Sequence, residues 1–401
     1  MRAGTVNPRL QSLQPYPFEK LRGLFEGAKP NPGLAHISLG IGEPRHPTPE
    51  LIKRALSENL AKLAAYPPTA GGDPLRQAIA EWLVRRYGLR AIDWKTEVLP
   101  VNGSREALFA FAQTVVDPAR GNSVVACPNP FYQIYEGAAL LAGARAHYVN
   151  TLSKRGFAAD YGAVPEEVWG RTQLLYVCSP GNPTGKVLDL DEWREIFSIA
   201  DRHGFIVASD ECYSEIYFDE AAPPLGALQA ATMLGRGFQR LVMFSSLSKR
   251  SNVPGMRSGF VAGDASVLEA FLLYRTYHGG AMNPAVQAAS VAAWNDEHHV
   301  RENRRKYAEK FARVTPMLQA ALRVERPDAG FYLWAPTPIA DTEFARRLYA
   351  EQNVTVLPGS FLARDSGGVN PGANYVRMAL VAEIDECLEA ARRIVEFTRK
   401  L

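Results

Sequence analysis

The sequence contains few cysteines and no CxxC pair. This argues against a zinc knuckle and against a dithiol redox motif. Three of the four cysteines, Cys127, Cys178 and Cys212, lie in or beside apolar runs, and Cys387 is the fourth. We therefore expect buried free thiols, which suit a reducing cytoplasm, and no metal site.

The sequence also lacks an excess of either charge and any long apolar run. Its 45 basic and 42 acidic side chains leave a formal net charge of +3, which argues against a nucleic-acid or membrane-surface role driven by bulk charge. No uninterrupted apolar stretch approaches the roughly 18–20 residues that span a membrane, and the N-terminus has no signal-peptide core. We expect a cytoplasmic protein with no nucleic-acid or membrane partner.

What the sequence does contain is a series of short, continuous apolar runs, at 123–128, 173–180, 205–210, 240–246 and 259–263. Continuous rather than alternating runs are typical of strands buried on both faces. Helical patterns lie between them: in 189–204, Asp189 or Asp191 can cap the start and Gly204 fits the end. This alternation predicts an α/β fold with a mostly parallel central sheet sandwiched by helices.

The C-terminal third has a different pattern. Long helices are expected within 284–325, strands at 330–336, 354–359 and 375–380, and a closing helix near the end. We expect three parts: an N-terminal segment, 1–46, that packs on the small domain; a large domain, 47–285; and a small α+β domain, 286–401.

Polar residues follow several of the predicted strands at their carboxyl ends. Asn182 follows the run at 173–180, and Asp210 ends the run at 205–210 with Tyr213 one turn further on. Ser246 and Lys249 follow the run at 240–246. In open α/β sheets such groups converge on one crevice. The sequence therefore predicts a pocket that holds an amide, a carboxylate, a phenol and an amine.

This set matches the needs of pyridoxal phosphate. The cofactor requires a lysine for a Schiff base and a carboxylate facing its pyridine nitrogen, and its phosphate suits hydroxyls, an arginine and a helix N-terminus. Each residue taken alone has another interpretation. Asp210 can be a helix cap, Asn182 a turn residue, Tyr213 a core aromatic, Arg257 a surface ion pair and Lys249 a solvated loop residue.

The segments SPGNPTG, SDECY and SSLSKRSNVPGMRSG resemble the class I, fold-type I aminotransferases that depend on pyridoxal phosphate, and the resemblance covers almost the whole chain. It implies that Lys249 carries the cofactor and then moves the substrate's Cα proton. It also implies that Asp210 pairs with the pyridinium nitrogen, that Asn182 and Tyr213 hold the phenolate oxygen, and that Ser246 and Arg257 hold the phosphate.

The same resemblance implies further cofactor contacts. Gly103, Ser104 and Arg105, in VNGSREAL, open a helix whose N–H groups face the phosphate, although a plain helix cap is an alternative. Tyr132, in PNPFYQIYEGA, stacks on the cofactor ring, with core packing as its alternative. Tyr66, in YPPTAGGDPLR, reaches the phosphate of a neighbouring subunit, which implies a homodimer.

Three residues are implied to bind the substrate. Arg377 binds the α-carboxylate through two parallel hydrogen bonds, Gly42 lies in the loop that closes over that carboxylate, and Asn182 contributes as well. The reaction implied is ping-pong transamination, in which the amine of Lys249 is the general base.

The stretches ISLGIGEPRHPTP, AAYPPTAGGDPLRQAIAEWL and PFYQIYEGAALLAGA are similar to the N-succinyldiaminopimelate aminotransferases of lysine biosynthesis. This implies amino transfer between glutamate and N-succinyl-2-amino-6-oxopimelate, with Arg22, Lys29 or Arg45 as candidates for the remote carboxylate. An aspartate, aromatic or kynurenine-type aminotransferase is the alternative within the family. A pyridoxal-phosphate lyase and a ligand-sensing regulator are further alternatives. The regulator requires an N-terminal DNA-binding domain, where this chain already resembles the aminotransferases.

Overall fold

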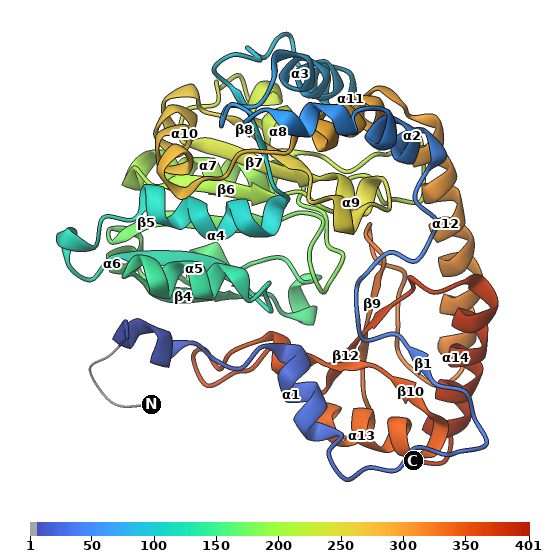
Figure 1. Ribbon diagram of the computed structural model, residues 1–401. Helices are drawn as coiled ribbons and strands as arrows, with labels where there is room; N and C mark the ends of the chain where they lie inside the picture. Colours follow the sequence, from blue (N-terminus) through green and yellow to red (C-terminus); the bar gives the residue numbers. More distant parts are fainter. Residues whose placement is uncertain (1–5) are drawn as a thin grey trace.

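The apolar runs in the middle of the chain form one large sheet in the computed structural model, which describes residues 6–401 (Figure 1). In this seven-stranded sheet, as far as the described residues go, β8 alone runs opposite to the other six strands, which confirms the mostly parallel sheet. The strand order is β2 (Val98–Val101), β8 (Gly259–Gly263), β7 (Leu241–Ser246), β6 (Ile206–Asp210), β5 (Thr172–Cys178), β3 (Val124–Asn129) and β4 (Arg145–Asn150).

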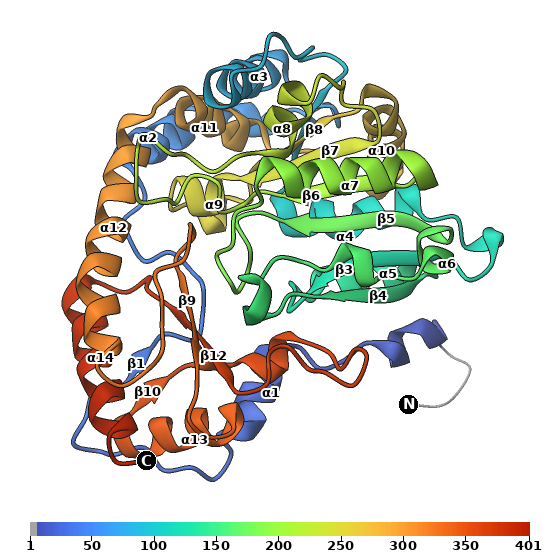
Figure 2. The ribbon, with the colours of Figure 1, turned by 180° about the vertical axis from the view of Figure 1, so that it is seen from behind.

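Helices cover both faces of this sheet, which explains why its inner strands are continuously apolar, whereas the edge strand β4 is partly exposed. In β5, Leu174 and Tyr176 face one core, and Leu175 and Val177 face the other. The first core includes α4 (Ser104–Val115), α5 (Ile134–Ala142) and α10 (Ala265–His278). The second, seen from behind in Figure 2, includes α2 (Glu50–Glu58), α3 (Asp73–Tyr87), α6 (Glu166–Trp169), α7 (Leu190–His203), α8 (Ala227–Met233) and α11 (Pro284–Asn295).

The ends of α7 follow the signals in the sequence. The Asp189 carboxylate accepts a hydrogen bond from the Glu192 N–H at 2.8 Å, and the Glu192 carboxylate accepts one from the Asp189 N–H at 2.8 Å. Gly204 ends the helix with φ of 76°, a conformation that glycine adopts without a steric penalty. Asp189 rather than Asp191 is therefore the cap.

The C-terminal third forms a second layer of a different kind. Three antiparallel strands, in the order β11 (Leu357–Pro358), β12 (Tyr375–Ala379) and β9 (Tyr332–Pro336), pack on α12 (His298–Leu318), α13 (Asp341–Gln352) and α14 (Ile384–Thr398). The single strand expected at 354–359 is instead two. Its first half, β10 (Val354–Thr355), pairs with β1 (Ile37–Ser38) of the N-terminal segment, whereas β11 pairs with β12.

Two details differ from the expected division of the chain. The boundary at 285 assigns α11 to the small domain, but its Ala289, Ala293 and Trp294 pack in the core of the large sheet. The long helix α12 then runs from one layer to the other (Figure 1). The partition into domains remains a prediction, and these contacts suggest that any boundary lies within α12.

The N-terminal segment contacts both layers. Its helix α1 (Pro17–Leu24) packs Leu21 against Trp334 and Leu357 of the smaller sheet, and β1 pairs with β10. The 3₁₀ turn at Pro8–Ser12 instead lies against α5 of the large sheet, because Gly143 leaves room for the Arg9 guanidinium. Residues 1–5 of the expected segment lie outside the described residues. Within 6–401 no helix is long and apolar enough to cross a membrane.

Candidate functional site

A cavity of about 460 Å³ opens at the carboxyl ends of β5, β6 and β7, where the large sheet meets the smaller one. Gly103 lies just behind its wall, and Tyr66 is fully exposed outside it. Arg22, Lys29 and Arg45 do not line it. The sequence-predicted residues that do line it are Gly42, Ser104, Arg105, Tyr132, Asn182, Asp210, Tyr213, Ser246, Lys249, Arg257 and Arg377.

Lys249 lies in the short helix α9 (Leu247–Arg250), directly after β7. Ser246 caps this helix by accepting a hydrogen bond from the Ser248 N–H at 3.1 Å. The Lys249 ammonium donates to the Gly42 carbonyl at 2.8 Å and lies 5.6 Å from the centre of the Phe331 ring. Burial lowers the pKa of this amine to about 8. A lysine of this kind can act as a nucleophile and as a proton carrier near neutral pH.

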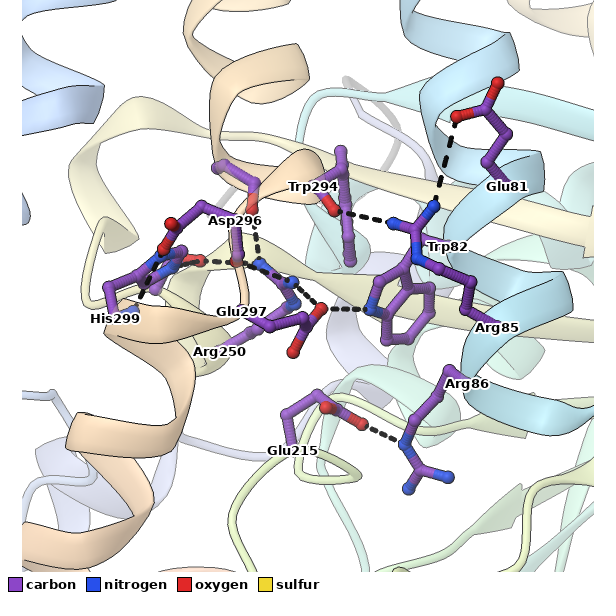
Figure 3. A network of polar contacts seen from close by, with 12 residues as sticks. Glu81, Trp82, Arg85, Arg86, Glu215, Arg250, Trp294, Asp296, Glu297 and His299 are labelled. Carbon is purple, nitrogen blue, oxygen red and sulfur yellow. Dashed lines mark hydrogen bonds and ion pairs between the residues drawn. The ribbon is translucent and has the colours of Figure 1, made fainter.

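The residue after Lys249 fixes α9 to the rest of the large layer (Figure 3). The Arg250 guanidinium is buried, lies 4.8 Å from the Trp294 ring and donates to the Glu297 carboxylate at 2.5 Å. It also donates to the Ala293 carbonyl at 2.7 Å. These contacts tie the turn that carries Lys249 to the junction of α11 and α12, so α9 has little freedom to move alone.

Asp210 ends β6 and presents its carboxylate to the cavity. One oxygen accepts from the Tyr135 hydroxyl at 2.7 Å and the other from the Cys212 N–H at 3.2 Å. Burial raises the pKa of this carboxyl, and the hydrogen bonds oppose that rise. A carboxylate held in this way can face a protonated ring nitrogen. Tyr135 itself is stacked on Tyr176 with ring centres 4.7 Å apart.

Arg377 lies in β12 of the smaller sheet and lines the same cavity as Lys249. It donates to the Asn182 side-chain oxygen and to the Gly40 carbonyl, each at 3.0 Å, and lies 4.3 Å from the Tyr332 ring. Its Nε is buried without a partner among the described residues. A buried guanidinium with an unused donor is suited to a carboxylate ligand.

Gly42 is required by the packing of the aromatic residues beside it. A Cβ at this position would lie 1.9 Å from the Tyr332 hydroxyl, far inside contact distance. That hydroxyl is in turn 3.0 Å from the Tyr213 hydroxyl. The absent side chain lets the loop, the two tyrosines and the Lys249 amine share one small space.

A cradle for an anion lies at the start of α4. The first N–H groups of a helix have no partner within it and carry partial positive charge. Gly103 precedes them with φ of 85°, and a Cβ there would lie 2.2 Å from an Arg257 nitrogen. Ser246, whose hydroxyl is 3.1 Å from the Ser258 carbonyl, lines the same end of the cavity. These groups fit a phosphate, so the residues present fit pyridoxal phosphate.

Arg105 and Tyr132 form the outer wall. The Arg105 Nε donates to the Tyr132 hydroxyl at 2.6 Å, and the guanidinium lies 6.0 Å from the Tyr16 ring. Tyr16 and Phe18 come from the N-terminal segment, which therefore closes one side of the cavity. Arg105 has a side chain at the mouth as well as a backbone in the anion cradle.

Sequence reasoning missed several residues that complete the site: Tyr16, Glu43, Tyr135, Cys212, Ser248 and Tyr332. Tyr135 carried a signal, since it is the second tyrosine of the stretch that contains Tyr132. Tyr332 carried none, because it lies far along the chain in a strand of the other sheet. The four cysteines are free, as predicted. Cys212 lines the cavity, and its thiol lies 2.9 Å from the Ser104 hydroxyl.

Comparisons with known proteins agree on the kind of protein. The family model "Aminotransferase class I and II" matches residues 35–394. An LL-diaminopimelate aminotransferase of Desulforudis audaxviator is 33% identical over 393 residues, 96% of each chain. A crystal structure of an aminotransferase from Neisseria meningitidis is 55% identical with a TM-score of 0.96, covering 98% of this chain and 100% of that one. A probable N-succinyldiaminopimelate aminotransferase from Thermus thermophilus is 29% identical with a TM-score of 0.83, covering 95% and 98%.

Proposed function

The chain belongs to the class I and II aminotransferases, and within that family we propose that it transfers an amino group between glutamate and N-succinyl-2-amino-6-oxopimelate. Members of the family depend on pyridoxal phosphate, which is the cofactor of this chain. The structural fold is that of its relatives over nearly their whole length. The substrate and the role of each residue are the parts that we propose.

When bound, pyridoxal phosphate supplies an aldehyde that condenses with amines and a ring that stabilises negative charge at the amino acid's Cα. In our proposal Lys249 would hold the cofactor, and its amine, once free, would be the base that takes the proton from the amino acid's Cα. Asp210 holds the proton on the ring nitrogen, while Asn182 and Tyr213 donate to the phenolate oxygen.

The remaining candidate residues bind and orient. The start of α4, with Ser246 and Arg257, would hold the phosphate, and Tyr132 would stack on the ring. Arg377 would grip the α-carboxylate and Gly42 would let the backbone approach it. Orientation matters because the Cα–H bond must stand perpendicular to the ring for the proton to leave, and a rigid two-point grip by a guanidinium provides it.

The observation that carries the choice of substrate is the charge of the cavity. Its lining holds four cationic residues, Arg105, Lys249, Arg257 and Arg377, against the acidic Glu43 and Asp210. Assigning Arg257 to the phosphate and Arg377 to the α-carboxylate leaves Arg105 at the mouth, beside Tyr16. A long substrate with further carboxylates at its remote end has a cation to meet there.

A second candidate is free LL-diaminopimelate, because curated relatives at 30–33% identity bear that name. The two substrates differ at the remote end, where the free compound carries an ammonium group and the succinylated one an amide with an extra carboxylate. Glu43, which lines the mouth, would suit the ammonium group.

The test is a panel of half-reactions followed by the absorbance of the bound cofactor. We expect glutamate and the succinylated diaminopimelate to convert it, and free LL-diaminopimelate, aspartate and phenylalanine to do so far more slowly. The Arg105→Gln variant should raise KM for the succinylated substrate, and Glu43→Gln should leave it unchanged. Preferential conversion by the free compound, lost in Glu43→Gln, would establish the second candidate.

We also propose a homodimer in which Tyr66 serves the partner's site. Tyr66 is fully exposed, and Leu60 and Leu63 nearby are exposed as well, which suits an interface. Mixing the inactive variants Lys249→Ala and Tyr66→Ala should restore activity, because a mixed dimer contains one site with both residues intact. A monomer in solution, or no recovery after subunit exchange, would contradict the proposal.

A further inference from the structure

A chain of buried hydrogen bonds reaches the backbone of Lys249 from outside the cavity. The Lys310 ammonium lies 2.7 Å from His46 Nε2, and His46 Nδ1 lies 2.8 Å from the Asn303 side-chain oxygen. The Asn303 amide nitrogen donates to the Lys249 carbonyl at 3.3 Å. The side chains of His46, Asn303 and Lys310 are all at most 5% exposed.

The direction of each bond follows from the groups involved. An ammonium group has no acceptor, so Lys310 donates and His46 Nε2 accepts. The ring proton therefore lies on Nδ1, which donates to the Asn303 oxygen. That oxygen also accepts from the Asn252 amide at 3.0 Å. His46 is thus held neutral and in one tautomer, with both ring nitrogens used.

His46 belongs to the loop that touches Lys249 from the other side. Gly42, four residues earlier, accepts the hydrogen bond of the Lys249 ammonium. At Leu39 the loop leaves the smaller layer, where the Leu39 N–H donates to the Thr355 carbonyl of β10 and its own carbonyl accepts from the Ala379 N–H of β12. It reaches the large layer at Thr48, whose hydroxyl donates to the Asn252 carbonyl. Between these two ends the side chain of His46 is a buried polar anchor, packed 4.8 Å from the Tyr307 ring.

We propose that His46 is a positioning residue for Lys249: held between Lys310 and Asn303, it fixes the loop that carries Gly42 and so sets where the Lys249 amine rests. The inference rests on the proposed role of Lys249. It adds His46 of the N-terminal segment and Asn303 and Lys310 of α12, none of which lines the cavity.

The charges around His46 determine the pH at which its hydrogen bond with Lys310 is lost. Burial first, and then the Lys310 charge, lower the pKa of His46 to about 4, and burial lowers the pKa of Lys310 to about 8. Lys306 on α12 adds positive charge, while Glu383 and Glu386 oppose it. A protonated His46 would turn an N–H toward the Lys310 ammonium. The anchor should therefore open in acid.

The first experiment tests the hydrogen-bond chain without any catalysis. The ring resonances of His46 are titrated by NMR in the cofactor-free wild type, in Lys310→Met and in the matched control Lys306→Met, which changes an exposed lysine of the same helix. We expect His46 to remain neutral to about pH 4 in the wild type. Its midpoint should rise by more than one pH unit in Lys310→Met and by much less in the control.

The second experiment measures the placement of Lys249 directly. The cofactor-free protein captures pyridoxal phosphate through the Lys249 amine, and absorbance follows the rate of capture. We expect His46→Phe to slow capture about 10- to 100-fold, as expected when a reacting group is displaced by about 1 Å. His46→Asn, which keeps a donor at the Nδ1 position, should recover part of that loss.

A lower melting temperature with an unchanged capture rate would show that His46 only stabilises the fold, and would overturn the proposal. If His46→Phe does not fold, Lys310→Met decides. At a pH below the titration midpoint of His46 in Lys310→Met, this variant must capture the cofactor more slowly than Lys306→Met does. Equal capture rates would overturn the proposal. A chain that behaves as expected here but transaminates no tested donor refutes the proposed function and leaves this inference standing.

Discussion

Lys249 should destabilise the cofactor-free protein at neutral pH. Lys249 is held in a buried cavity where its ammonium has one hydrogen bond, to the Gly42 carbonyl. Burial lowers its pKa from 10.5 to about 8. The charged form of Lys249 is therefore less stable in the folded protein than in the unfolded chain. We predict that Lys249→Met raises the free energy of unfolding of the cofactor-free protein.

The magnitude follows from the two pKa values. A difference of about 2.5 units at about 1.4 kcal/mol per unit corresponds to about 3.5 kcal/mol. The variant loses one hydrogen bond made by a charged group, which lowers this gain by about 1.5 kcal/mol. The expected net gain is about 2 kcal/mol at neutral pH.

The dependence on pH fixes the sign independently. Below about pH 8 the lysine is charged in both states and the full cost is present. Between about pH 8 and pH 10.5 the folded protein has lost the proton and the unfolded chain still holds it, so the wild type gains stability as the pH rises. Above this window the cost is gone, and the two proteins should differ by no more than the lost hydrogen bond.

The assay is urea unfolding of both proteins without cofactor, since bound cofactor would stabilise only the wild type. Lys306→Met is the matched control, because Lys306 is exposed, and it should change stability by less than about 0.5 kcal/mol. A wild type more stable than Lys249→Met at neutral pH would refute the reasoning. So would a difference that stays constant up to pH 10.

Three further predictions concern single contacts. Gly42→Ala should lower stability by about 1–3 kcal/mol through its clash with Tyr332; adding Tyr332→Phe should relieve part of this in thermal melts, and equal melting temperatures for both would contradict it. Tyr135→Phe removes the hydroxyl that donates to one buried Asp210 oxygen. The dissociation constant of pyridoxal phosphate, measured by equilibrium titration, should therefore rise about tenfold. An unchanged dissociation constant would show that Asp210 does not face the cofactor. Asp189→Ala should cost about 1 kcal/mol in urea unfolding by uncapping α7 without altering amino transfer; a loss of activity there would show coupling that the structure does not contain.

Local patterns in the sequence were sufficient for five of the seven strands of the large sheet. β3, β5, β6, β7 and β8 are continuous apolar runs that can be recognised without knowing their neighbours. β2 is only four residues long and the edge strand β4 is partly exposed, and neither was predicted. The cap of α7 is equally local, because donor and acceptor are three residues apart. The same patterns misjudged residues 354–359, since nothing in a short apolar run indicates that its two halves pair with different strands.

The candidate site divides in the same way. Asn182, Asp210, Ser246 and Lys249 were predictable because parallel strands bring their carboxyl ends to one edge, which makes position along the chain equivalent to position in space. Tyr332 and Glu43 were not, because they enter the cavity from the smaller sheet and from a loop. No periodicity links either of them to the large sheet.

The sequence by itself determined the α/β architecture, the cofactor and the set of groups at the strand ends, since short-range patterns carry all three. Only the tertiary structure decided what surrounds Lys249. The loop of Gly42, the helix of Asn303 and the strand of Arg377 are more than 40 residues from it along the chain, and they meet it through packing of two sheets. Burial in that junction, which no stretch of sequence encodes locally, is the physical reason that its pKa is low.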